Sequence, residues 1–95
     1  MTDEELEKLR QDVSVKLEQL PATPDEQLDR RERRHRTVLR ARIRALERMK
    51  KARQEGNVHQ EARAGLDYTL LTEYGERNIF LYNIMKARLF WWRGI

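Results

Sequence analysis

The chain has 95 residues, of which 38% are charged and 7% aromatic, and its formal net charge is +4. This length suits one small domain with a modest core and leaves little room for a deep catalytic cleft. Because the chain contains no cysteine, disulfide bridges, zinc sites with thiolate ligands and thiol nucleophiles are excluded.

Charge is strongly segregated along the chain. Residues 1–29 contain nine acidic and three basic residues, a balance of −6, whereas residues 30–53 contain twelve basic and two acidic residues, a balance of +10. Residues 54–95 balance to zero. Because the local field attracts a ligand more than the net charge does, the basic segment is the first candidate for a binding surface.

The first predicted helix covers about residues 2–20. Thr2 and Glu5 have the spacing of a capping box, and Pro21 ends the helical pattern. Apolar residues recur every three or four positions and form a stripe on one face, which comprises Leu6, Leu9, Val13, Leu17 and Leu20. The acidic N-terminus lacks the apolar core of a secretory signal, so we expect a cytoplasmic location.

The second predicted helix covers about residues 24–55. Thr23 is a suitable N-cap, Pro24 a suitable first residue, and Gly56 with Asn57 a suitable end. On a helical wheel, one side carries an apolar stripe of Leu28, His35, Val38, Leu39, Ile43, Leu46 and Met49. We expect this stripe to face the next helix.

The third predicted helix covers about residues 57–92, with a kink or interruption at Gly75. The tight turn before it favours an antiparallel hairpin, which would place Ile43 near Leu70 and Leu28 near Met85. The predicted fold is therefore a single all-α domain over residues 1–95. It is a coiled-coil-like helical hairpin of two long helices, with a short N-terminal helix packed at the open end beside the aromatic C-terminus.

A cationic ridge lies opposite the apolar stripe of the second helix. Its members are three or four residues apart: Arg30, Arg33, Arg36, Arg40, Arg44, Arg48 and Lys51. Like charges at this spacing destabilise a helix by a few tenths of a kcal/mol per pair, so an anionic partner is expected. The partner is a nucleic acid, an acidic protein or membrane surface, or the acidic N-terminal segment of the chain itself.

Nucleic acid is the favoured partner, because the planar guanidinium fork of arginine donates paired hydrogen bonds to phosphate. Phosphate contacts carry no sequence information, so the predicted function is sequence-independent binding of DNA or RNA. The base-reading residues Asn and Gln are absent from the ridge, although arginine itself can read guanine.

The C-terminal segment from Ile79 to Trp92 is apolar on nearly every side of a helix, yet its fourteen residues are too few to span a bilayer. Such a segment is buried by its own chain or by a partner. The candidate partner-binding residues are Phe80, Ile84, Leu89, Phe90, Trp91 and Trp92. The alternative function is therefore a structural or adaptor protein that docks a protein partner or forms a homo-oligomer through this helix.

Catalysis, metal binding and a cofactor are not expected. His35 and His59 are far apart, and the sequence contains no metal-binding motif and no Gly-rich phosphate loop. The predicted hairpin places His35 in the core opposite Asn78. It also places Asp67, Glu73 and Glu76 near the arginines of the second helix, where ion pairs explain them better than acid–base chemistry.

Overall fold

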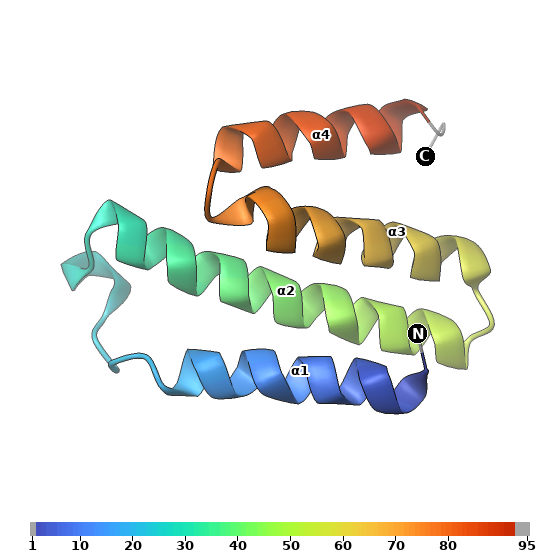
Figure 1. Cartoon of the computed structure of the whole chain (residues 1–95), viewed down its shortest axis with the longest axis horizontal. Coiled ribbons are helices and arrows are strands. Elements are labelled where there is room, and N and C mark those ends of the chain that lie inside the picture. Colours follow the sequence, from blue (N-terminus) through green and yellow to red (C-terminus); the bar gives the residue numbers. More distant parts are fainter. Residues whose placement is uncertain (1, 93–95) are drawn as a thin grey trace.

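The computed structural model describes residues 2–92, which are mostly helical and contain no strand (Figure 1). Within this range the α-helices are α1 (Asp3–Glu18), α2 (Arg30–Gln54), α3 (Val58–Leu70) and α4 (Ile79–Trp92). A short 3-10 helix, η1 (Asp25–Gln27), precedes α2, and a one-turn π-helix, η2 (Leu71–Gly75), follows α3. The α-helices lie in a row in chain order, each antiparallel to the one before, and the molecule measures 41 × 30 × 18 Å.

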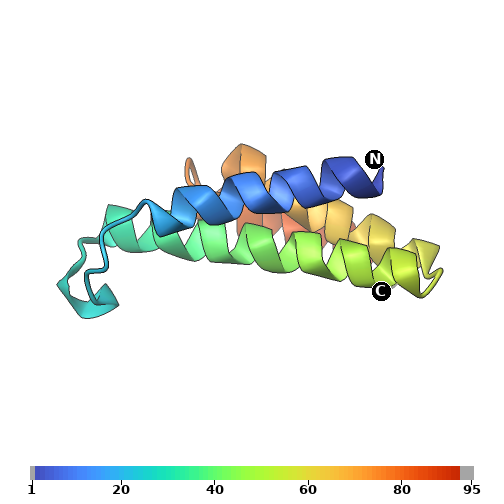
Figure 2. The ribbon, with the colours of Figure 1, turned by 90° about the horizontal axis from the view of Figure 1, so that it is seen from below.

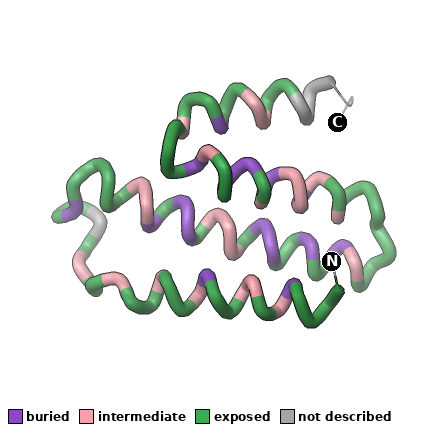
Figure 3. The backbone as a smooth tube through the Cα atoms, viewed as in Figure 1, coloured by how far each residue is buried: buried purple, intermediate pink, exposed green. Residues whose placement is uncertain are grey.

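Helix α2 is the centre of the fold, because it packs against both α1 and α3. Leu39 and Leu46 are each 1% exposed and form a core with Leu6 and Val13 of α1. Figure 3 shows the buried positions concentrated on α2 and on the sides of its neighbours that face it. Burying a leucine side chain contributes about 1.5–3 kcal/mol, so this shared core accounts for much of the stability.

Each α-helix begins with a polar side chain that accepts a hydrogen bond from a backbone amide of its first turn. These N-cap residues are Thr2, Asp29, Asn57 and Asn78, which accept from the amides of Glu5, Glu32, Gln60 and Leu81. Such caps satisfy amides that have no partner inside the helix. At the other end of α2, Gly56 has a φ of 71°, the left-handed conformation that glycine adopts readily.

The second helix begins later than predicted. The chain from Pro24 forms a separate turn, in which the amide of Gln27 donates to the carbonyl of Pro24 (2.9 Å). Helix α2 begins at Arg30, because the Asp29 carboxylate caps it by accepting from the amide of Glu32 (2.8 Å).

The helix predicted over residues 57–92 is interrupted at Gly75, which the prediction allowed, but it does not continue as one bent helix, because the chain reverses after η2. Gly75 is buried, and a Cβ there would lie 3.1 Å from Val38 Cγ1, so glycine permits the close approach of η2 to α2. The amide of Asn78 donates to the carbonyl of Tyr74 (2.8 Å), and Asn78 then caps α4. Helix α4 therefore returns alongside α3.

Two expectations that followed from a continuous third helix are also wrong. Met85 does not pack near Leu28, because it joins a second core on α3, η2 and α2 that includes Leu70 and Ala45. The end of α4 lies toward the α2–α3 turn rather than beside Pro21 (Figure 1).

The N-terminal helix is likewise not confined to the open end. Helix α1 packs lengthwise along α2, as Figure 2 shows from the side. The leucine stripe of α1 packs against α2, because Leu9, Leu17 and Leu20 contact the core cluster that contains Leu39. Helices α2 and α3 therefore lie between α1 and α4 (Figure 1).

Arg36 fastens the linker between α1 and α2. Its guanidinium donates to the carbonyl oxygens of Thr23 (2.6 Å) and Pro21 (2.5 Å), and the residue is 7% exposed. A buried charge is tolerated only when hydrogen bonds compensate the loss of hydration, and the two linker carbonyls provide them.

We expect Arg36→Ala to lower the free energy of unfolding by about 2–4 kcal/mol, because two hydrogen bonds from a charged donor are lost. Urea denaturation followed by circular dichroism measures this change. The matched control is Arg44→Ala, an exposed arginine of the same helix, which should change stability by less than about 0.5 kcal/mol. Equal losses in the two variants would contradict the role assigned to Arg36.

Candidate nucleic-acid interface

The cationic ridge keeps six of its seven predicted members on the exposed side of α2. These are Arg30, Arg33, Arg40, Arg44, Arg48 and Lys51. Arg36 corrects the prediction, because it is buried against the linker and does not belong to the exposed surface. Arg33 is also held locally, since its Nη2 donates to the carbonyl of Leu28 (3.1 Å).

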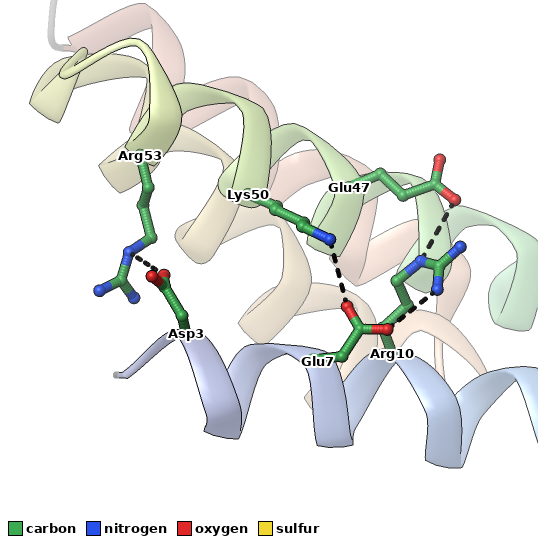
Figure 4. Close-up of polar contacts among 6 residues, drawn as sticks. All are labelled: Asp3, Glu7, Arg10, Glu47, Lys50 and Arg53. Atoms are coloured by element: carbon green, nitrogen blue, oxygen red, sulfur yellow. Dashed lines mark hydrogen bonds and ion pairs between the residues drawn. The ribbon is translucent and has the colours of Figure 1, made fainter.

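Figure 4 shows ion pairs that join α1 to residues of α2 beside the ridge. They join Asp3 to Arg53 (3.1 Å), Glu7 to Lys50 (3.4 Å) and Arg10 to Glu47 (3.6 Å). Lys50 and Arg53 face α1 and lie outside the ridge. Asp3 and Glu7 of α1 therefore compensate basic residues on the side of α2 that faces α1.

Asp67 of α3 is the buried acid closest to the ridge, and it binds groups from the helices on either side. Its Oδ2 accepts from Arg48 Nη2 (2.7 Å), and its Oδ1 accepts from the Tyr82 hydroxyl (2.6 Å). Lys86 Nζ lies 3.5 Å from the same Oδ1. Because Asp67 is only 3% exposed, these partners replace the water that its carboxylate has lost.

A central groove opens between α2 and α4 above this carboxylate. It is lined by Ala41, Arg44, Glu47, Arg48, Lys51, Asp67, Tyr82 and Lys86. Four of these side chains are cationic and two are acidic, and both acids have a cationic partner. Within the described residues, neither Arg44 nor Lys51 forms an ion pair, so the groove carries an excess of positive charge.

The central groove continues toward the α2–α3 turn. There, Arg48, Lys51 and Asp67 also border a second hollow, together with Gln60 and Arg63 of α3 and Glu55 at the end of α2. Cations from α2, α3 and α4 thus border two hollows that share Arg48, Lys51 and Asp67. The sequence pattern had suggested α2 alone.

A second cationic groove, the N-terminal groove, lies at the start of α2. It is lined by Arg30, Arg31, Glu32, Arg34, His35, Glu76 and Arg77. The N-terminal end of a helix carries a partial positive charge from the macrodipole, so cations in the first turn are unfavourable there. An anion bound in this groove would offset both sources of positive charge. The side-chain hydrogen bond between Asp29 and Glu32 raises the pKa of the Glu32 carboxyl.

His35 corrects two expectations. Its side chain is 42% exposed and therefore not a core histidine, and its Nδ1 lies 2.7 Å from Glu76 Oε1 and not against Asn78. The reason is the chain reversal after Gly75, which brings Glu76 to the start of α2 and leaves Asn78 to cap α4.

Some interface residues were missed by the sequence reasoning. Lys86 and Arg63 are isolated bases in mainly neutral segments, and Arg77 lies in the reversal, so no local pattern marked them. Only the path of α4 brings Lys86 to Asp67 and the central groove.

The predicted partner-binding residues are only partly described. Phe80 and Ile84 of α4 are 74% and 42% exposed. The side chains of Leu89, Phe90, Trp91 and Trp92 lie outside the described residues.

The described side chains do not bring three or more His, Asp or Glu residues together in a way that could hold a metal ion. Among the helices that the structure describes, none combines the length and apolar character needed to cross a membrane. Comparison of the chain with protein-family models, with curated proteins and with solved structures gives no match. Function is therefore inferred from geometry and charge.

Burial and the hydrogen bond to Asp67 raise the pKa of the Tyr82 hydroxyl well above its usual value of 10. In the unfolded chain the same hydroxyl ionises near pH 10. The contribution of Tyr82 to stability is therefore complete below pH 10 and declines as the pH rises beyond it.

We expect the free energy of unfolding to fall between about pH 10 and 11, and Tyr82→Phe to fall less steeply over this range. Urea denaturation at a series of pH values measures both slopes. Tyr74→Phe is the control, because Tyr74 is a partly buried tyrosine of the same core, and it should retain the wild-type slope. A wild-type slope in Tyr82→Phe would contradict the assignment.

Proposed function

We propose that this protein binds nucleic acid without catalysis, through contacts from the cationic ridge and the central groove to backbone phosphates. The observation that carries the proposal is the convergence of Arg44, Arg48, Lys51 and Lys86 on one groove, with two of these cations in no ion pair among the described residues. An anionic polymer is the ligand that would relieve this concentration of charge.

The arrangement of the ridge supports a polymeric ligand over a single small anion. Arg40, Arg44 and Arg48 are four residues apart, so they rise by about 6 Å per step along α2 and present a row of charges. Arginine side chains in such a row can engage successive phosphates with paired hydrogen bonds. The N-terminal groove offers a further cationic surface at the other end of the same helix.

Binding should be largely independent of sequence. The central groove is lined by cations, two acids, Ala41 and Tyr82, and it presents no Asn or Gln amide to a base edge. Phosphate contacts provide affinity and register but do not distinguish bases. Such binding depends strongly on salt, because each neutralised phosphate releases counterions.

Non-catalytic binding fits the state of the acids near the grooves. Asp67 is committed to three partners, Glu47 pairs with Arg10, and Glu76 pairs with His35. Groups held in this way stabilise the surface and are poorly placed to abstract a proton from a substrate.

The competing function is that of a structural or adaptor protein, and one observation favours it. Phe80 is 74% exposed on α4, the last helix of the row, next to the half-exposed Ile84. Exposed aromatic and aliphatic side chains in one patch are typical of protein-binding surfaces. The two functions are compatible, because the patch and the central groove use different residues.

We expect the double variant Arg44→Glu/Lys51→Glu to bind a short labelled DNA duplex and an RNA strand more weakly than the wild type. Fluorescence anisotropy between about 50 and 200 mM salt should give a log–log slope reduced by about two, because two phosphate contacts are lost. Two duplexes of unrelated sequence should bind alike.

The matched control is Lys8→Glu/Lys16→Glu, which makes the same charge change on the exposed side of α1 and should keep most of the affinity. Equal weakening in the two double variants would indicate a general charge effect and refute the groove. An absence of binding by the wild type at low salt would refute the function itself.

A further inference from the structure

Helix α4 has one side packed on the protein and one side without cover. Tyr82 is buried and Met85 partly buried, and both join the core formed with α3, η2 and α2. On the other side, Phe80, Leu81 and Ile84 are 74%, 37% and 42% exposed. Because α4 is the last helix in the row, this apolar side forms an edge of the molecule (Figure 1).

The outer side of α4 has few charges. The helix contains no acidic residue. Phe80, Ile84 and Arg88 are spaced four residues apart and therefore lie along the same side of the helix, with Arg88 as the charged member. If two copies of this side were placed together in an antiparallel orientation, the cation of each copy would lie opposite the aromatic ring of the other. This side of α4 is therefore complementary to itself.

The rest of the described surface offers no second patch of this kind. Among the described side chains, which do not include those of residues 89–92, the other exposed large hydrophobic residues are Val15 on α1 and Val58 at the start of α3. Val15 is surrounded along α1 by charged residues such as Asp12, Lys16 and Glu18. Among the described surfaces of another copy of this chain, the one that matches the outer side of α4 is therefore α4 itself.

We propose that two copies of the protein associate through α4 in an antiparallel pair, with the two-fold axis next to Ile84. This is a closed, isologous contact, which is the commonest symmetry of homo-oligomers. Ile84 meets the partner subunit's Ile84, and Phe80 meets the partner subunit's Arg88. An arginine guanidinium over an aromatic face is a favourable cation–π contact.

Charge permits this arrangement. The two Arg88 side chains lie on opposite sides of the axis, eight residues apart along the pair, which corresponds to about 12 Å. That separation exceeds the Debye length of about 8 Å at physiological ionic strength, so their repulsion is screened. The antiparallel pairing also extends the alternation of directions that relates α1, α2, α3 and α4.

The dimer is independent of the proposed nucleic-acid function, so it is tested without nucleic acid. The chain has no cysteine, so Ile84→Cys introduces a single thiol beside the predicted axis. Under mild oxidation, Ile84→Cys should form a disulfide-linked dimer at least about tenfold faster than Val15→Cys, because the pair raises the effective thiol concentration to the millimolar range. Equal rates in the two variants would overturn the proposal.

Sedimentation velocity of the unmodified protein at several concentrations gives a second readout. The wild type should shift from monomer to dimer as its concentration rises, whereas Ile84→Asp should remain a monomer with an unchanged circular dichroism spectrum. A wild type that is monomeric at every concentration would overturn the proposal, as would a monomer that binds neutral phosphatidylcholine vesicles through Phe80 and Ile84.

Discussion

The buried carboxylate of Asp67 is the constraint on which the position of α4 depends. A carboxylate that is 3% exposed must receive strong hydrogen bonds or ion pairs, because its hydration has been lost. Arg48 supplies one from α2, and Tyr82 and Lys86 supply two from α4. Tyr82 and Lys86 are four residues apart, so one face of α4 must turn toward Asp67.

Two surfaces follow from that orientation. Turning Lys86 inward places a cation from α4 in the same groove as Arg44, Arg48 and Lys51, which creates the proposed phosphate-binding surface. Turning the opposite side outward exposes Phe80 and Ile84 at the edge of the row, which creates the proposed dimer surface. One buried acid thus relates the two proposed interactions of the molecule, although they use separate side chains.

Local patterns predicted the helical class and the cap at Thr2, because these depend on residues close in sequence. The apolar stripe of α2 likewise identified Leu39 and Leu46, since its period shows directly in the chain. A kink or interruption at Gly75 was predicted, but the reversal of chain direction was not, because apolar residues continue through it with helical spacing. Asn78, which caps α4, is the residue that indicates most clearly that a new helix begins after the reversal. The burial of Arg36 depends on carbonyl groups of the linker, Thr23 and Pro21, which lie outside the helix. A helical wheel of α2 therefore could not predict it.

Hydrogen exchange in Asp67→Asn tests most directly whether Asp67 holds α4 in place. The amide keeps the size of the carboxylate but removes the charge that attracts Arg48 and Lys86. Local opening that is confined to one element raises exchange in that element alone. Amides of α4 should lose protection while those of α1 and the centre of α2 keep it. Unchanged protection in α4, or an equal loss in every helix, would contradict this role of Asp67.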